Sequence, residues 1–421
     1  MKFSRGVAAW TRRDSATWIR RGLLAVVLLG AAIIPGRASS QTAAHCTGAR
    51  CSGSGSVLWS TRLTGDWVAE PGFTGTVPAS GEAYAASAGQ LAVLGVGTTV
   101  AGYSVRTGHL SWQSTLTGLP VDAAIVSVRA WPATIAVGVS APAGQSGQSR
   151  VEILLSAATG RQIRSVPAAF YGGAVWSSRS STVIVGNHGV TSYANSSGRV
   201  LWQRATGTAA QTWTASGRYL FMAVTAGGYL VSGPVTAIRR IDLATGAEHV
   251  IHLRGRFAGT LSAAVDGVGL LSGGSELRGY SLRTGQLLWQ RAAAALELVD
   301  PGTATAYIAV GNSLYALRPT TGDLLGRPAQ SVAAGLYAIR RGVALGLDQG
   351  ALGVAWGYNM TSRKVVWTSS ALPWPHFFAD SSGLGGSAGQ DSAVTLLATC
   401  AAKGSGSPAV CQRPELTAIK Y

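Results

Sequence analysis

Apolar and polar residues alternate in short runs along most of this chain, and turns rich in Gly, Ser and Thr separate the runs. Runs of this kind predict β-strands, and the turn residues predict hairpins between them. In residues 280–289, for example, Tyr280 ends one strand, Thr284 and Gly285 form the turn, and Trp289 lies in the next strand. Helical periodicity is nearly absent after residue 40. The pattern therefore predicts one large all-β domain.

This unit returns along the chain as an apolar residue, a turn Gly five residues later, and a Trp four residues after the Gly. Clear copies occupy residues 103–112, 193–202 and 280–289, and weaker copies fill the gaps. The turn positions are residues 55, 108, 160, 198, 246, 285, 322 and 363. Their spacing of 37 to 53 residues is typical of a propeller, in which each repeat supplies one four-stranded blade.

The eight turn positions predict an eight-bladed β-propeller over residues 57–421, preceded by an N-terminal signal or anchor helix. Residues 57–59 have no earlier strands of their own, and residues 415–421 form a strand-like end with no outer strand after it. We therefore expect N- and C-terminal strands to share one blade and close the ring, which protects the strand edges. Seven blades is the alternative, because two of the intervals exceed 50 residues.

The turn Gly and the Trp have separate expected roles. Gly adopts a positive φ without steric cost, which suits a hairpin turn. Trp offers a large flat surface, which suits packing between neighbouring blades. The residues expected to dock blades in this way are Trp59, Trp112, Trp202, Trp289 and Trp367.

The N-terminal 56 residues predict export from the cytoplasm. Residues 1–21 are basic, residues 22–36 form an uncharged apolar stretch of 15 residues, and residues 37–56 read as a flexible tether. This order is typical of a secretory signal, whereas a membrane-spanning helix needs about 20 apolar residues. The signal is expected either to be cleaved or to be retained as a membrane anchor. Either outcome places the propeller outside the cytoplasm, secreted or held at the cytoplasmic membrane.

Four Cys residues occur as two close pairs, Cys46 with Cys51 and Cys400 with Cys411. Outside the cytoplasm such pairs predict disulfides. A Cys400–Cys411 bridge would pin a hairpin beside the closing blade, and a Cys46–Cys51 bridge would close a small loop in the tether. The four Cys are not expected to bind metal, because the pairs lie far apart and no His shares their spacing.

The net charge is +17, of which +11 remains when residues 1–40 are removed. Arg outnumbers Lys by 30 to 4, and the excess charge is spread along the chain. This charge is explained either by an Arg-rich solvated surface or by attraction to acidic cell-wall polymers or anionic lipid. We expect no nucleic-acid partner for a monomer outside the cytoplasm.

The sequence offers little catalytic chemistry. His249 and His252 form the one close His pair, and residues three apart on a strand face opposite sides. Asp300 and Asp348 lie in turn-like sequences, where Asp is favoured for local hydrogen bonding. We therefore nominate no catalytic, cofactor-binding or metal-binding residue and expect no cofactor.

The repeat resembles that of the PQQ-like β-propeller family within the quinoprotein alcohol dehydrogenase-like superfamily. Thr107, Thr245, Thr284 and Thr321 match its Thr-Gly turn, and Asp242 keeps its Asp. The resemblance covers about residues 57–421 and implies either a quinone-dependent dehydrogenase with Ca²⁺ or a BamB-like binding scaffold without cofactor. The adjacent Cys-Cys disulfide of such dehydrogenases is absent here, and no carboxylate cluster stands out.

These observations favour a non-catalytic binding or scaffold propeller outside the cytoplasm, with a protein or a cell-envelope polymer as its partner. One alternative is an oxidoreductase that depends on pyrroloquinoline quinone, or a degenerate relative of one. The other is a basic surface protein that binds envelope polyanions.

Overall fold

A computed structural model of the chain describes residues 57–62, 67–68, 83–119, 123–140, 150–168, 173–186, 189–205, 210–225, 233–292, 294–300, 302–310, 313–330, 336–340, 342–347, 352–369, 372–373, 376–377, 394–400, 410–411 and 414–420. The chain divides into compact units 1–42 and 43–421, and all described residues belong to the second. Every regular element in these ranges is a β-strand. The described residues include no helix that is long and apolar enough to cross a membrane. The predicted segments 1–21, 22–36 and 37–56 lie outside the described residues.

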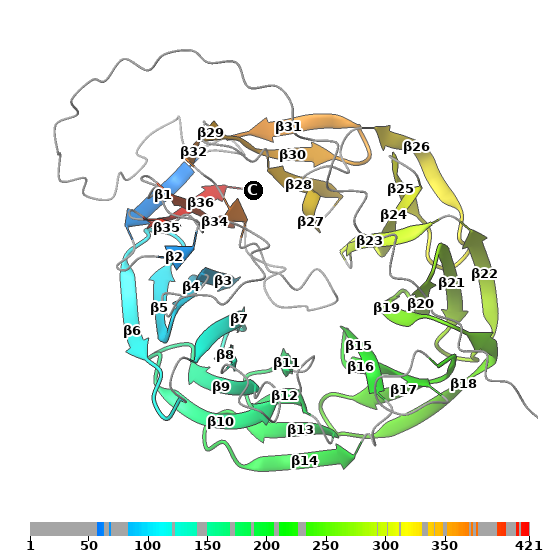
Figure 1. Cartoon of the computed structure of the whole chain (residues 1–421), viewed down its shortest axis with the longest axis horizontal. Coiled ribbons are helices and arrows are strands. Elements are labelled where there is room, and N and C mark those ends of the chain that lie inside the picture. Colours follow the sequence, from blue (N-terminus) through cyan, green and yellow to red (C-terminus); the bar gives the residue numbers. More distant parts are fainter. Residues whose placement is uncertain are drawn as a thin grey trace, which may run out of the picture. The chain divides into compact units, whose positions relative to one another are not determined.

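Seven four-stranded sheets each arise from one continuous stretch of chain, and neighbouring strands pair antiparallel. We number them blades 1 to 7 in chain order, and in each the first strand lies innermost and the last outermost (Figure 1).

Blade 1 contains β3 (Ala83–Ala88), β4 (Leu91–Val96), β5 (Thr99–Ser104) and β6 (Leu110–Thr115), and blade 2 contains β7 (Ala124–Ala130), β8 (Thr134–Ser140), β9 (Arg150–Ser156) and β10 (Gln162–Ala168). Blade 3 contains β11 (Gly173–Ser177), β12 (Ser181–Gly186), β13 (Gly189–Ala194) and β14 (Val200–Ala205). Blade 4 contains β15 (Ala210–Ser216), β16 (Tyr219–Thr225), β17 (Val235–Asp242) and β18 (Glu248–Phe257). Blade 5 contains β19 (Thr260–Val265), β20 (Val268–Gly273), β21 (Glu276–Ser281) and β22 (Leu287–Ala292). Blade 6 contains β23 (Ala295–Asp300), β24 (Thr305–Val310), β25 (Ser313–Leu317) and β26 (Leu324–Gln330). Blade 7 contains β27 (Leu336–Arg340), β28 (Val343–Leu347), β30 (Ala355–Asn359) and β31 (Lys364–Thr368).

A further four-stranded sheet, the seam sheet, joins the two ends of the propeller sequence. Its strands are β33 (His376–Phe377), β34 (Val394–Cys400), β36 (Pro414–Lys420) and β1 (Val57–Arg62). β1 pairs antiparallel with β36, with Trp59 opposite Ala418. Two short ribbons lie outside the blades, β2 (Trp67–Val68) with β35 (Val410–Cys411) and β29 (Leu352–Gly353) with β32 (Leu372–Pro373).

The predicted fold class, an eight-bladed propeller behind an N-terminal helix, is corrected on two points. Seven blades are each made by one continuous stretch of chain, and the two chain ends meet in the composite seam sheet, whose inner strand β33 has only two residues. The turn signal at residue 55 was one too many, because it precedes the seam strand β1 and has no blade of its own. No helix occurs in the described ranges, and the stretch expected to be helical lies outside them.

The core lies between neighbouring blades. Between blades 1 and 2, for example, Val93 and Val100 pack with Ile125, Ile135 and Val137, all of them almost completely buried. Middle strands are covered on both faces by the adjacent blades, so their apolar runs are nearly continuous. Outer strands such as β6, β14 and β22 alternate half-buried and exposed residues, because only one face meets a neighbour.

Candidate functional site

The contact between successive blades is built around the motif Trp. In β6, Trp112 lies opposite Gly102 of its own blade and against Gly160, the turn Gly of blade 2. A Cβ on Gly102 would lie 2.4 Å from Trp112 Cε2, and one on Gly160 would lie 2.3 Å from Trp112 Cε3. The indole is thus held between two glycines, and its Nε1 donates a hydrogen bond to the Ala157 carbonyl at 2.9 Å.

The same arrangement recurs at other blade boundaries. Trp289 lies between Gly279 of its own blade and Gly322 of blade 6, and its Nε1 donates to the Pro319 carbonyl at 2.6 Å. The fully buried Trp59 of the seam lies against Gly108 of blade 1. Because each indole needs a glycine on the facing blade, the turn Gly serves the interface as well as the turn.

Two of the expected docking Trp residues depart from this arrangement. Trp202 packs against Gly246 of blade 4, but its Nε1 has no hydrogen-bond partner among the described residues. Trp367 lies over Gly357 and packs with Leu397 of the seam sheet. Sequence reasoning missed the glycines that lie opposite Trp112, Trp289 and Trp367 within their own blades. These glycines, Gly102, Gly279 and Gly357, each directly precede the motif Tyr.

Arginines add a second bond at several boundaries. Arg204 and Arg291, each two residues after the motif Trp, donate from Nε to the carbonyls of Gly246 and Gly322 at 2.7 and 2.6 Å. In blade 2, Arg164 occupies the Trp position; it donates to the Gly198 carbonyl at 2.6 Å and its guanidinium lies over the Tyr193 ring. Some of the arginines are therefore used to join blades.

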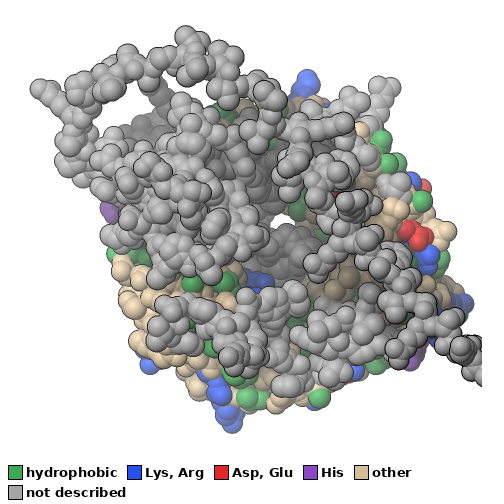
Figure 2. Space-filling view, in the orientation of Figure 1, with side chains coloured by type: hydrophobic (Ala, Val, Ile, Leu, Met, Phe, Trp, Pro, Cys, Tyr) green, Lys and Arg blue, Asp and Glu red, His purple; other side chains and the backbone are tan. Residues whose placement is uncertain are grey.

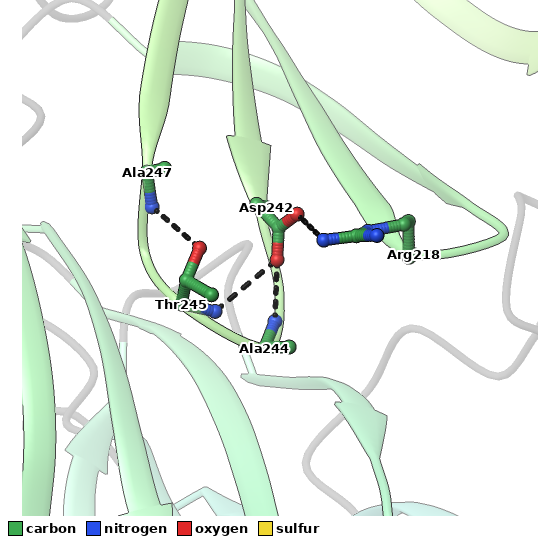
Figure 3. A network of polar contacts seen from close by, with 5 residues as sticks. All are labelled: Arg218, Asp242, Ala244, Thr245 and Ala247. Atoms are coloured by element: carbon green, nitrogen blue, oxygen red, sulfur yellow. Dashed lines mark hydrogen bonds and ion pairs between the residues drawn. The ribbon is translucent and has the colours of Figure 1, made fainter.

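Asp242 organises the turn of blade 4 (Figure 3). Its Oδ1 accepts hydrogen bonds from the backbone amides of Ala244 and Thr245 at 3.0 and 3.1 Å, and its other oxygen pairs with Arg218. The Thr245 hydroxyl accepts from the amide of Ala247 at 3.2 Å. These contacts explain the family pattern, since both Asp and Thr bond amides that the tight turn leaves free. Asp242 is therefore a turn residue.

Ionised Asp242 is expected to stabilise the fold. Burial opposes its ionisation, but hydrogen bonds from Arg218 and from the two amides, together with the Arg218 charge, lower its pKa below the ordinary 3.8. A carboxylate whose pKa is depressed by folding stabilises the protein above its unfolded pKa, and that contribution is lost as the pH falls through the folded pKa.

We expect Asp242→Asn to lower the free energy of unfolding by about 1 kcal/mol at pH 7, because Arg218 is exposed and its pairing is partly screened. The difference from the parent should shrink in strong acid, where both carry a neutral side chain. Urea unfolding between pH 7 and pH 2 measures it. Asp266→Asn, at an exposed turn position with φ of 50°, is the control. If the loss of stability in Asp242→Asn stayed constant in acid, the ionised carboxylate of Asp242 would not be what stabilises the fold.

Asp300 joins blade 6 to blade 7. It is buried, and its Oδ2 accepts a hydrogen bond from the amide of Gly342, in the turn between β27 and β28, at 2.6 Å. Its Oδ1 accepts from the amide of Gly302 at 3.0 Å. Burial and then the Asp300 charge raise the pKa of Tyr307 to about 12, against a hydrogen bond with Thr303 that lowers it. Asp300 therefore has a structural role beyond its own turn.

A buried polar cluster lies between blades 2 and 3. Arg129 Nη1 donates to the Ala174 carbonyl at 2.6 Å, and the Ala174 amide donates to Glu152 Oε1 at 3.2 Å. Arg129 Nη1 and Glu152 Oε2 each lie 3.0 Å from the point that a Cβ on Gly173 would occupy. Burial lowers the pKa of the Arg129 guanidinium, and Glu152 opposes that change. The two charged side chains thus hold the backbone amide and the backbone carbonyl of Ala174 in the next blade.

The remaining sequence candidates are not brought together. His249 lies opposite Arg240 and His252 opposite Ala237 in the β17–β18 ladder, so they occupy separate positions along β18. Among the described side chains, no three His, Cys, Asp or Glu residues are placed to share a metal ion. Cys46 and Cys51 lie outside the described residues. Cys400 and Cys411 end β34 and β35, but their side chains are not described, so both disulfides stay predictions.

The outer strands expose apolar side chains directly before the motif Trp. Exposed pairs occur as Val200 with Leu201 in β14, Leu287 with Leu288 in β22, and Val365 with Val366 in β31. Figure 2 shows Lys and Arg side chains scattered around the edge of this view, with few acidic ones among them. The rim of the propeller therefore offers apolar and basic groups for contact with a partner.

Comparison with known proteins agrees with this geometry. The sequence model of a family described as "Outer membrane protein assembly factor BamB" matches residues 186–345. Residues 186–345 therefore carry a PQQ-like propeller repeat. The resemblance inferred from the Thr-Gly and Trp positions is thereby confirmed. A comparison with curated proteins finds no match.

Several solved propellers are similar to this PQQ-like chain. BamB from Moraxella catarrhalis is 16% identical with a TM-score of 0.40, over 65% of this chain and 80% of that protein. The dihydro-heme d1 dehydrogenase NirN is 15% identical with a TM-score of 0.48, over 69% and 66% of the two chains. A europium-containing methanol dehydrogenase is 10% identical with a TM-score of 0.46, over 75% and 83%. At these values the likenesses carry no argument about function.

Proposed function

We propose that this chain is a non-catalytic binding or scaffold propeller outside the cytoplasm, secreted or held at the cytoplasmic membrane by its N-terminal segment. Its partner would be a protein or a cell-envelope polymer, and the propeller would act as a monomer. The observation that carries the proposal is the outer rim, where exposed Leu and Val pairs stand among basic side chains.

The use of the carboxylates supports the same proposal. Asp242 and Asp300 bond backbone amides of turns, and Glu152 bonds the next blade. Glu248 and Glu276 pair with Arg239 and Arg278. A Ca²⁺-dependent quinone site needs several oxygen ligands at one place, whereas these carboxylates are distributed among separate structural contacts. The family description, an outer membrane protein assembly factor, also favours a binding role.

The test is photo-crosslinking in the cells that produce the protein. A photoreactive phenylalanine replaces Leu201, Leu288 or Val366 on the rim, and Arg179, exposed in the β11–β12 turn, serves as the control position. We expect discrete adducts from at least one rim position and none from the control. Absence of rim adducts, together with micromolar binding of pyrroloquinoline quinone and Ca²⁺ to the purified chain by calorimetry, would replace this proposal with the oxidoreductase alternative.

A further inference from the structure

Blade 4 carries more positive charge than its own acidic residues neutralise. Its two described carboxylates are already engaged, Asp242 with Arg218 and Glu248 with Arg239. Arg254 and Arg256 in the outer strand β18 are exposed and have no ion pair with any described residue. Charge of this kind, left without an internal partner on an outer strand, is available to an acidic group on another molecule.

The two arginines lie where the pairing of β18 with β17 is irregular. His252 pairs with Ala237 of β17, but the next partners along the ladder are Phe257 and Val235, so β18 contains additional residues at this point. Gly255 has a φ of 103°, which a residue with a side chain rarely adopts. Residues 253–256 therefore form a bulge. A bulge also prevents another strand from pairing along this edge, so a partner would have to bind through side chains.

An exposed apolar pair lies directly beside the bulge. The Arg254 amide donates to the Gly285 carbonyl at 2.9 Å, which fixes the blade 5 turn against β18. A Cβ on Gly285 would lie only 1.9 Å from the His252 carbonyl oxygen. The chain then continues from Gly285 into Leu287 and Leu288, which are 39% and 44% exposed. We call this surface, made of His252, Arg254, Arg256, Leu287 and Leu288, the β18–β22 step.

A nearly identical outer strand elsewhere has a different basic neighbour, since Arg199 directly precedes β14 where Gln286 directly precedes β22. β14 reads Val-Leu-Trp-Gln-Arg-Ala and β22 reads Leu-Leu-Trp-Gln-Arg-Ala. Beside β14, however, Arg164 of β10 is occupied, because it bonds the Gly198 carbonyl and lies over the Tyr193 ring. The exposed Leu201 of β14 therefore provides a comparison position on another outer strand, beside the single exposed Arg199 instead of the pair Arg254 and Arg256.

We propose that the β18–β22 step binds an acidic segment of a partner protein that carries large apolar side chains next to its carboxylates. Arginine recognises carboxylates with directed, charge-assisted hydrogen bonds, and Leu287 and Leu288 would be removed from water by the apolar neighbours. A polyanion alone would satisfy the arginines and leave the leucines in water. This inference rests on the proposed function, and it specifies which chemistry the protein partner presents.

The test uses the purified full chain and three fluorescent peptides. In the first peptide, Glu residues alternate with Leu and Phe residues. The second peptide has Gln in place of each Glu, and the third has Ser in place of each Leu and Phe. We expect the acidic apolar peptide to bind most tightly, with an affinity that falls as salt is added. Arg254→Glu with Arg256→Glu should weaken it by about tenfold or more, and Leu288→Ser by several-fold. Leu201→Ser should leave it unchanged.

Other outcomes would overturn the proposal. Failure of the acidic apolar peptide to bind, equal binding of the Ser peptide, or no effect of Leu288→Ser would each do so. Inorganic polyphosphate that binds with the same dependence on Arg254 and Arg256, and displaces the peptide regardless of Leu288, would assign the surface to polyanions instead. Unfolding midpoints equal to that of the parent show that each variant is folded. If rim crosslinks in cells persist while peptide binding fails, the proposed function stands and only this inference is lost.

Discussion

Replacement of Trp59 by alanine is expected to lower the free energy of unfolding by about 3–5 kcal/mol, the cost typical of removing a fully buried aromatic side chain. Trp59 is fully buried, lies against Gly108 of blade 1, and donates from Nε1 to the Val105 carbonyl at 2.5 Å. It also belongs to β1, which closes the ring by pairing with β36. Its loss therefore leaves a cavity at the seam, where the two ends of the propeller sequence meet.

Urea unfolding followed by tryptophan fluorescence and circular dichroism measures this loss. Trp59→Phe keeps an aromatic ring but loses the hydrogen bond, so we expect a smaller cost of about 1–2 kcal/mol. Trp202→Ala is the matched control, because Trp202 packs against the equivalent turn glycine but is half-buried and makes no Nε1 hydrogen bond to a described residue. Equal losses for Trp59→Ala and Trp202→Ala would show that the seam contact has no special importance.

The second large effect is expected from Glu152→Leu. Glu152 is completely buried, and its removal would leave the Arg129 guanidinium without the one carboxylate that opposes its burial. It would also leave the Ala174 amide without its acceptor. Arg129 and Glu152 are not in direct ion-pair contact, but both bond the backbone of Ala174. We therefore expect a loss of about 3 kcal/mol, the low end of the cost of leaving a buried charge uncompensated.

A double-mutant cycle separates these contributions. Arg129→Met combined with Glu152→Leu should be more stable than the sum of the single changes implies, because neither of these two charges is then left without the other. Glu152→Gln keeps an acceptor for the Ala174 amide and removes only the charge, so it should fall between the parent and Glu152→Leu. Additive losses in the cycle would show that the two side chains act independently.

The sequence determined the local part of this structure. Alternating apolar runs gave the strands, and the Thr-Gly turn followed from local chemistry, since each turn Gly from Gly108 to Gly322 has a φ between 67° and 73°. The repeat spacing gave the propeller, and the Thr-Gly and Trp positions gave the family. These features depend on residues close together in the chain, so one sequence suffices to find them.

Tertiary structure alone decided the contacts between distant residues. The glycine that faces each Trp lies on another strand or another blade. Gly160 is 48 residues from Trp112 in the chain, and the sequence alone does not show which residue at such a separation the indole contacts. The pairing of the two ends of the propeller sequence was expected from the sequence, but its turn signal was counted as an additional blade, and only the structure shows that Trp59 lies opposite Ala418. The Arg129–Glu152 clamp and the β18–β22 step join residues of neighbouring blades. Hydrophobic patterning specifies which face of a strand is buried, but only the packed ring decides which side chains meet across it.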